Sequence, residues 1–345
     1  MTVLGVGFLG AGAATQAIHL PTVAALGDRF RVVRVMDADA AIAGKVAAIA
    51  GASATTDVAA VLDDPDVDIV VIASPADRHA EQAIAACEAG KKAILCEKPL
   101  ATSRADGQRI LRAARSSGTP VVLGTMHAYD PACRAVLAAW RALRAEAELV
   151  RSSIHIPADD IYIHAATRVL SPPPPWLVPP RPWAAGLASA FVTDMMLGLT
   201  IHDIPLIREL RPTVDRVVYA SVLDPIGYAM AALCGQGCVE LVSVVTGDWD
   251  AAWQLEAWSR TAELSIEFPP SYVHAGSAVA RLSTAEGTRE WRYPENGYYA
   301  EWTHLADLAM GLAEPWISLD EAVQDLRFAL DLADGAAGLC EVSSG

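Results

Sequence analysis

A lysine that directly follows a buried apolar run is the residue whose type and position most clearly suggest catalysis. Glu97, Lys98 and Pro99 come after the run 93–96. In a sheet of parallel strands, ligands bind beyond the carboxyl ends of the strands, which would place Lys98 near a bound ligand. Its ammonium could then hydrogen-bond a substrate hydroxyl and stabilise the alkoxide that develops when a carbinol carbon is oxidised. Taken alone, the tripeptide is also compatible with a surface turn.

Glycines near the N-terminus fit a phosphate-binding turn in two registers. Gly5, Gly7 and Gly10 match G-x-G-x-x-G formally, but little strand precedes them. The register 10–15 (Gly-Ala-Gly-Ala-Ala-Thr) leaves a full strand before the turn and a helix after it, with Thr15 in place of the third glycine. In such a turn the second glycine, here Gly12, admits the pyrophosphate, which faces the helix N-terminus. We therefore expect the turn at residues 10–12.

A carboxylate ends the second expected strand and bears on which dinucleotide would bind. Asp37 lies 25 residues after Gly12. A carboxylate there accepts hydrogen bonds from the adenosine ribose hydroxyls and repels a 2′-phosphate, so it favours NAD over NADP. No arginine follows closely to hold that phosphate. A helix N-cap or turn aspartate is the alternative interpretation.

Two histidines are candidates for proton exchange or substrate contact. His202 lies in an expected helix over 194–210, and its unperturbed pKa near 6.5 suits proton transfer at neutral pH, although a lone helical histidine is more often structural. His127 follows the last strand of the first domain and could face the substrate or serve as a hinge. Arg181 and Trp183 end a proline-rich loop, where they could clamp an anionic group and stack on a sugar.

The elements that must position these residues change character along the chain. Up to about residue 125, apolar runs at 3–9, 31–36, 69–73, 93–96 and 121–124 alternate with helical stretches, which indicates βαβ units and a parallel sheet. After residue 148, strand-like runs follow one another, which indicates an antiparallel sheet with one solvated or subunit-facing side. These runs are 149–156, 216–222, 228–233, 239–246, 262–268 and 278–283. We expect a dinucleotide-binding domain over 1–125 and a substrate and oligomerisation domain over 126–345, with a helix at about 319–335 packing back on the first domain.

Composition excludes several classes of partner. The chain has 345 residues, 53% of them hydrophobic, and a net charge of −15, which disfavours nucleic acid and anionic membranes. No apolar segment reaches the roughly 18 residues of a membrane span. Six scattered cysteines without a Cys-x-x-Cys pair are typical of reduced thiols, so we expect a cytoplasmic protein. No His, Cys or carboxylate spacing indicates a metal.

Several of these motifs together resemble the glucose–fructose oxidoreductase/inositol dehydrogenase (Gfo/Idh/MocA) family. They are Gly10-Ala11-Gly12, Ser74-Pro75 with His79, the run 96–100 (Cys-Glu-Lys-Pro-Leu), His202-Asp203, and the segment 314–336. The resemblance implies an α/β N-terminal Rossmann domain and an α+β C-terminal domain with an open, mainly antiparallel sheet. It implies NAD(P)-dependent oxidation or reduction at a carbinol carbon of a sugar, cyclitol or related small compound, in a homodimer or homotetramer built through that sheet. By analogy, Lys98 and His202 hold the reacting oxygen, and His202 exchanges its proton.

The chain departs from the family pattern at two positions. The family carries Asp one helical turn before the catalytic histidine, where this chain has Gly198. Asp194 lies two turns before His202 and would be roughly 12 Å from it on a regular helix, too far for direct contact. Either a local irregularity brings Asp194 closer, or Asp203 or a water takes the place of the missing carboxylate, or the acid–base pair is altered. His127 stands where relatives commonly have Arg or another polar residue.

These considerations define the expected site. The expected catalytic residues are Lys98, His202 and Asp194. The expected cofactor-binding residues are Gly10, Gly12, Ala13, Ala14, Asp37, Ser74, Pro75, His79, Glu97 and Lys98. The expected substrate-binding residues are His127, Arg181, Trp183 and Asp203. An NAD-dependent oxidoreductase is the main hypothesis; an NAD-using lyase or epimerase with transient oxidation and a catalytically inactive dinucleotide-binding homologue are the alternatives.

Overall fold

Two compact units make up the chain in the computed structural model, which describes residues 2–157, 161–163, 169–170, 187–224, 226–246 and 250–342. The first unit comprises residues 1–124, 163–174 and 298–326. The second comprises residues 125–162, 175–297 and 327–345. The first unit therefore takes in a C-terminal stretch in addition to the N-terminal part of the chain.

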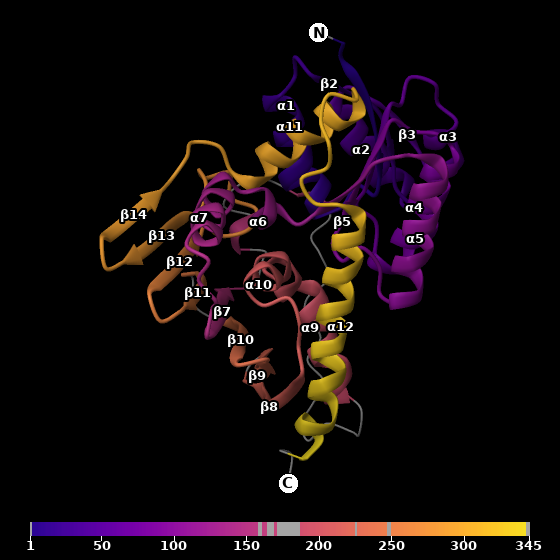
Figure 1. Cartoon of the computed structure of the whole chain (residues 1–345). Helices are drawn as coiled ribbons and strands as arrows, with labels where there is room; N and C mark the ends of the chain where they lie inside the picture. Colours follow the sequence, from indigo (N-terminus) through magenta and orange to yellow (C-terminus); the bar gives the residue numbers. More distant parts are fainter. Residues whose placement is uncertain are drawn as a thin grey trace. The chain divides into compact units, whose positions relative to one another are not determined.

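The first unit is built on a six-stranded parallel sheet with the strand order β3-β2-β1-β4-β5-β6. Figure 1 labels β2, β3 and β5 of this sheet. Its strands are β1 Leu4–Leu9, β2 Phe30–Met36, β3 Ser53–Thr55, β4 Ile69–Ile72, β5 Ala93–Glu97 and β6 Val121–Gly124. This order is that of the Rossmann fold, in which the carboxyl ends of β1 and β4 flank the point where the strand order reverses. Strands β1 and β4 are buried along their whole length, which explains their continuous apolar sequences.

Helices connect these strands, and local sequence signals set their ends. They are η1 Thr15–His19, α1 Leu20–Ala25, α2 Ala40–Ala50, α3 Val58–Leu62, η2 Ala76–Arg78, α4 His79–Glu88, α5 Arg104–Ser117 and α11 Gly297–Ala309. Asp39 caps α2 by accepting hydrogen bonds from two of its first backbone amides. Gly51 and Gly118 end α2 and α5 in the left-handed conformation that suits glycine. The helical stretch after β1 begins with a π-helical segment, η1, which the sequence pattern did not indicate.

The second unit is built on an eight-stranded sheet with the order β14-β13-β12-β11-β7-β10-β9-β8. Its strands are β7 Leu149–Pro157, β8 Arg216–Leu223, β9 Ile226–Cys234, β10 Gly237–Thr246, β11 Ala252–Trp258, β12 Ala262–Phe268, β13 Val279–Thr284 and β14 Gly287–Trp291. All neighbouring pairs are antiparallel except β7 with β10. Buried and less buried residues alternate along β7, β10 and β11, so one face of the sheet is covered and the other is open.

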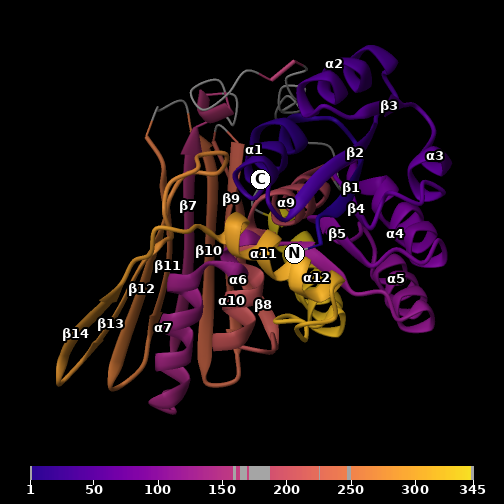
Figure 2. The ribbon, with the colours of Figure 1, turned by 90° about the horizontal axis from the view of Figure 1, so that it is seen from above.

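Helices of the second unit cover one face of its sheet. They are α6 Met126–Tyr129, α7 Pro131–Ala142, α9 Leu187–Gly198, η3 Thr200–His202 and α10 Ile204–Leu210, together with the later part of α12 Leu319–Val342. Helix α7 contacts β12, β13 and β14, and α9 contacts β9. Figure 2 shows α6, α7 and α10 along the same face of this sheet.

The structure corrects one helix that bears on the site. The predicted single helix over 194–210 is broken, because α9 ends at Gly198 and a 3-10 turn, η3, precedes α10. Leu199 leaves the helical conformation with φ −126° and ψ −61°, and Thr200 hydrogen-bonds to Tyr228 and Ser243 of the sheet. The regular helix that was assumed between Asp194 and His202 is therefore not present.

The fold class is confirmed: a Rossmann domain with a parallel sheet precedes an α+β unit with a mainly antiparallel sheet. The first part of α12 belongs to the first unit, where Leu326 lies against Gly107 of α5. Among the described residues, no helix is both long and apolar enough to cross a membrane.

Candidate active site

The turn after β1 has a backbone that only glycine accommodates well. Gly10 has a φ of +105°, and a Cβ placed there would lie 2.5 Å from the carbonyl oxygen of Ala73. Its backbone amide donates to the carbonyl of Met36, which ties the turn to the end of β2. Gly5 and Gly7 lie inside β1, so the structure places the turn in the second of the two registers considered above.

The second glycine of the turn leaves open space. A Cβ on Gly12 would meet no atom within 4 Å, and the chain is helical from Ala13 through Ala25. Thr15 stands where the third glycine was expected, is fully buried, and donates its hydroxyl to the carbonyl of Gly10 at 2.7 Å. The turn thus combines an open approach to the backbone with a helix start, which is the geometry that binds a pyrophosphate.

A cavity of about 810 Å³ opens at this turn. Its lining consists of Gly10, Gly12, Ala13, Met36, Asp37, Ala38, Val58, Ala73, Ser74, Pro75, Arg78, Glu81, Gln82 and Ala85. Asp37 accepts hydrogen bonds from the backbone amides of Ala11 at 2.8 Å and Asp39 at 3.0 Å, so its carboxylate is fixed at the end of β2. The volume and the mixed lining suit a small organic ligand.

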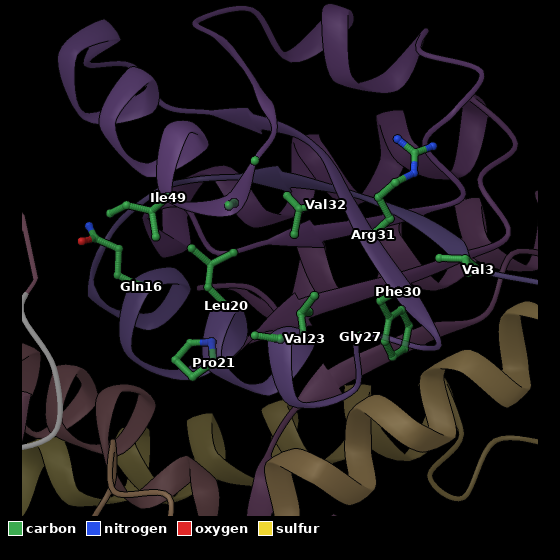
Figure 3. Close-up of a pocket in the computed structure, with 13 residues that line it drawn as sticks. Val3, Gln16, Leu20, Pro21, Val23, Gly27, Phe30, Arg31, Val32 and Ile49 are labelled. Atoms are coloured by element: carbon green, nitrogen blue, oxygen red, sulfur yellow. The ribbon is translucent and has the colours of Figure 1, made fainter.

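A second cavity of about 680 Å³ lies in the same unit, between α1, β2 and the end of α2 (Figure 3). Leu20, Val23, Phe30, Val32 and Ile49 contribute mainly apolar side chains to it. It shares no lining residue with the cavity at Asp37 and presents no group suited to catalysis.

Hydrogen bonds fix the loops that carry Ser74 and Lys98. The two ring nitrogens of buried His79 lie 2.9 Å from the carbonyl oxygen of Ser74 and 2.7 Å from that of Pro99. The hydroxyl of Ser74 donates to Gln82 at 2.7 Å. The peptide bond between Lys98 and Pro99 is cis. His79, expected to bind cofactor, thus joins the segments that follow β4 and β5.

Glu97 is held by a chain of buried side chains that sequence reasoning missed. The indole N–H of Trp302 donates to Nδ1 of His19 at 3.2 Å, and Nε2 of His19 lies 2.9 Å from Oε1 of Glu97. Because an indole can only donate, Nδ1 of His19 accepts and Nε2 carries the hydrogen that Glu97 receives. Oε2 of Glu97 accepts from the backbone amide of Lys98 at 3.1 Å. Burial raises the pKa of the Glu97 carboxyl, but His19 and Lys98 outweigh it and lower the pKa overall.

A second carboxyl lies in the same interior. Glu301 is 1% exposed, and its Oε1 has no hydrogen-bond partner among the described residues. Burial, together with the charge of Glu97, raises the pKa of Glu301 well above its usual range. The two pKa values are thus shifted in opposite directions, so Glu97 ionises before Glu301 as the pH rises.

The second unit contains a buried carboxylate with its own set of donors. Asp203 is fully buried and accepts from Ser152 Oγ at 2.6 Å, from Nδ1 of His127 at 2.8 Å and from the indole N–H of Trp253 at 2.9 Å. The ring of His127 stacks on Phe268, with centroids 3.8 Å apart and planes 13° apart. The ring of His202 lies 5.7 Å from that of His127. Three expected site residues, His127, His202 and Asp203, are thus brought together.

Other expected residues do not join this cluster. Asp194 is exposed on α9, where partial burial raises the pKa of its carboxyl, and no hydrogen bond links it to another residue in the described part of the chain. Arg181 and Trp183 lie outside the described residues. Within the ranges that the structure describes, no group of three or more His, Cys, Asp or Glu side chains could hold a metal ion.

Trp253 and Ser152 also escaped the sequence reasoning, although a signal was present. Trp253, Leu255 and Ala257 alternate with Gln254 and Glu256, which is the pattern of a strand with one buried face. That pattern places Trp253 inside the unit, where its N–H requires an acceptor.

Comparisons with known proteins agree with this geometry. Residues 4–125 match the model of an oxidoreductase family described as having an NAD-binding Rossmann fold, GFO_IDH_MocA. The match covers the Rossmann part of the chain, about a third of its length. Inositol 2-dehydrogenase 2 from Saccharopolyspora erythraea is 39% identical over 131 residues, which cover 37% of this chain and 37% of that protein. The aligned region thus spans little more than a third of that relative.

Solved structures extend the likeness of fold to nearly the whole chain. A putative myo-inositol dehydrogenase from Sinorhizobium meliloti has a TM-score of 0.72 at 21% identity, covering 97% of this chain and 98% of that one. A 3-ketoreductase from Actinomadura kijaniata, solved with NADP, has a TM-score of 0.72 at 18% identity with the same coverage. At these identities the likeness supports the fold of both units.

Proposed function

We propose that this chain is an NAD-dependent oxidoreductase that acts on a carbinol or carbonyl carbon of a sugar, cyclitol or related small polyhydroxylated compound. The observation that carries the proposal is the cavity at the Gly10–Gly12 turn, with the fixed carboxylate of Asp37 in its wall. The match of residues 4–125 to a family with an NAD-binding Rossmann fold supports the same conclusion.

The residues around this cavity suit a dinucleotide. Gly12 and the backbone amides at the helix start would hold the pyrophosphate, and the carboxylate of Asp37 would accept from the adenosine ribose hydroxyls. The bound dinucleotide would supply hydride transfer at its nicotinamide ring. Ser74 and Pro75 line the cavity directly, whereas His79 and Glu97 would act by fixing the segments around them.

We infer a preference for NAD, even though the ketoreductase neighbour was solved with NADP. Asp37 would repel a 2′-phosphate. Arg78 is the cation of the cavity lining, but it faces the carboxylates of Asp77 at 3.7 Å and Glu81 at 3.9 Å. Those carboxylates offset the attraction that Arg78 would offer to a phosphate.

Lys98 would orient the reacting oxygen and stabilise negative charge on it. His202 would hold the reacting oxygen together with Lys98. We further infer a cytoplasmic homodimer or homotetramer, assembled through the open face of the eight-stranded sheet.

The test begins with cofactor binding and continues with turnover. Calorimetry with NADH and NADPH would measure both affinities, and we expect NADH to bind more tightly. Formation or consumption of NADH would then be followed with myo-inositol, aldoses and keto-sugars, for wild type and Lys98→Ala. We expect Lys98→Ala to lose activity by roughly 100-fold or more while still binding NADH. Lys45→Ala, at an exposed position on α2, is the matched control.

Each alternative predicts a different result. A lyase or epimerase would convert substrate without net NADH formation. A homologue that has lost catalysis would bind NADH and turn over none of these compounds. Failure of wild type to bind either dinucleotide would refute the proposal as a whole.

A further inference from the structure

We propose that His127, oriented by Asp203, is the group that exchanges the substrate hydroxyl proton in the oxidoreductase reaction. The inference rests on the proposed function and assigns its acid–base step to a histidine that replaces the family's usual residue type. It is drawn from the hydrogen bonds around Asp203, the packing of the His127 ring and the position of His127 along the chain.

The hydrogen bond to Asp203 determines which nitrogen of His127 is available. Nδ1 lies 2.8 Å from Oδ1 of Asp203, and an ionised carboxylate can only accept. In the neutral ring Nδ1 therefore carries the hydrogen, and Nε2 carries the lone pair. Nε2 makes no hydrogen bond to any residue in the described part of the chain. This is the orientation that a carboxylate gives to a catalytic imidazole in hydrolases.

Packing holds the ring in that orientation. His127 stacks on Phe268 at 3.8 Å and meets the edge of Trp253 at 4.7 Å, so rotation about its side-chain bonds would cost aromatic contacts on two sides. Asp203 is equally fixed, because Ser152 and Trp253 donate to it at 2.6 and 2.9 Å. A buried carboxylate with three donors would also stabilise the imidazolium that forms when Nε2 takes up a proton.

The covalent chain restricts where His127 can be. It follows Gly124, the last residue of β6, by three positions, which limits the distance between their Cα atoms to about 11 Å. Gly124 pairs in register with Glu97, the neighbour of Lys98. The chain thus carries the Cα of His127 no farther than this from β6, the strand that pairs with β5 just before Lys98.

The alternative pair, His202 with a carboxylate one turn earlier, is absent from this chain. Gly198 occupies that position at the end of α9, and Asp194 is exposed without a hydrogen bond to His202. The buried carboxylate of this region, Asp203, bonds to His127 instead. His202 remains a neighbour, with its ring centre 5.7 Å from that of His127, and would contact the same substrate.

In oxidation, the hydroxyl proton would pass to Nε2 of His127 as the carbinol carbon loses its hydride, and the carbon–oxygen single bond would become a carbonyl. A bound oxidised dinucleotide would be the hydride acceptor. The imidazolium, paired with Asp203, then releases its proton to solvent. In reduction the same proton is donated to the oxygen as hydride arrives at carbon.

Two measurements test the proposal, and one does not require a substrate. In protein labelled with ¹⁵N-histidine and free of cofactor, long-range ¹H–¹⁵N spectra report which ring nitrogen carries hydrogen; His127→Gln identifies the signal. We expect hydrogen on Nδ1 in wild type and a loss of this preference in Asp203→Asn. If Asp203→Asn does not fold, Ser152→Ala removes one donor from the carboxylate and should shift the His127 signal while keeping the tautomer.

The second measurement is turnover with NADH or NAD⁺ and a substrate found in the screen described above. We expect His127→Gln to lower kcat by roughly 100-fold or more, with its NADH affinity within about twofold of wild type. Lys45→Ala, at an exposed position on α2 that is not a site residue, should leave kcat unchanged.

The outcomes separate this inference from the proposed function. Hydrogen on Nε2 of His127, or a kcat unchanged in His127→Gln, would overturn the role of His127 and leave the oxidoreductase proposal intact. Failure of wild type to bind NADH would instead refute the proposed function, on which the role of His127 depends.

Discussion

Replacement of Glu301 by glutamine should make the protein more stable at neutral pH, by an amount that grows with pH. Glu301 is buried near the ionised Glu97, and its pKa is raised well above the usual value of 4.5 by burial and by that charge. The folded protein therefore keeps a proton on Glu301 at pH values where the unfolded chain has lost it. Glutamine has nearly the same shape and needs no proton.

The magnitude follows from this difference in proton binding. Below pH 4.5 the side chain is protonated in both states and stability is unaffected by its titration. Above that value the unfolded chain releases the proton, and wild type loses about 1.4 kcal/mol of unfolding free energy per pH unit until Glu301 ionises in the folded state. Between about pH 5 and about pH 7, Glu301→Gln should thus gain about 2.7 kcal/mol over wild type if Glu301 stays protonated.

Urea unfolding at a series of pH values would measure this difference. Burial also raises the pKa of Asp130, so stability depends on pH through other groups as well. Subtracting the wild-type unfolding free energy cancels the contributions of groups that the substitution leaves unchanged. Glu314→Gln, at an exposed position in the same unit, should give a difference that does not change with pH. In addition, infrared spectra at neutral pH should lose the carbonyl band of a protonated carboxylic acid in Glu301→Gln. A stability difference independent of pH, with no change in that band, would refute a protonated Glu301.

Three further predictions concern binding and assembly. The free energy of unfolding of Gly12→Ala should lie within about 0.5 kcal/mol of that of wild type, because the added Cβ meets no protein atom, whereas Gly10→Ala should be clearly destabilised. Calorimetry should show that Gly12→Ala binds NADH at least tenfold more weakly. An NADH affinity equal to that of wild type would contradict the pyrophosphate site. Asp37→Ser should raise the ratio of NADP to NAD affinity by roughly tenfold, and an unchanged ratio would remove Asp37 from the ribose site. Val242→Arg places a charge on the open face of β10, so sedimentation velocity should show monomers. A variant that sediments like wild type would exclude this face as the subunit interface.

Much of the first unit could be predicted because its signals are local in sequence. Strands buried on both faces produce continuous apolar runs, and the turn at Gly10 needs a backbone that glycine adopts. Strands β3 and β14 were missed because they are short and mainly exposed, and so lack an apolar pattern. The break at Gly198 was missed because Thr200 bonds to Tyr228 and Ser243, which are distant along the chain.

The candidate site was predictable in its residue types but not in its partnerships. Lys98, His127, His202 and Asp203 were expected from motif and position. Donors that fix them come from far along the chain, as with Trp253, which lies 50 residues after Asp203. Periodicity and short motifs report on local structure, so they do not reveal such pairs.

The two buried histidine–carboxylate pairs show why these partnerships decide function. In both, a tryptophan N–H supplies an additional hydrogen bond. In the first unit, Trp302 donates to the ring of His19, which in turn faces Glu97, so both ring nitrogens are occupied and His19 can only position its neighbours. In the second, Trp253 donates to the carboxylate of Asp203 itself. His127 then needs only Nδ1 for its carboxylate, and Nε2 stays available for a proton. The same three residue types thus build a fixed support in one unit, and in the other they leave a ring nitrogen that, under our proposal, would exchange the substrate proton.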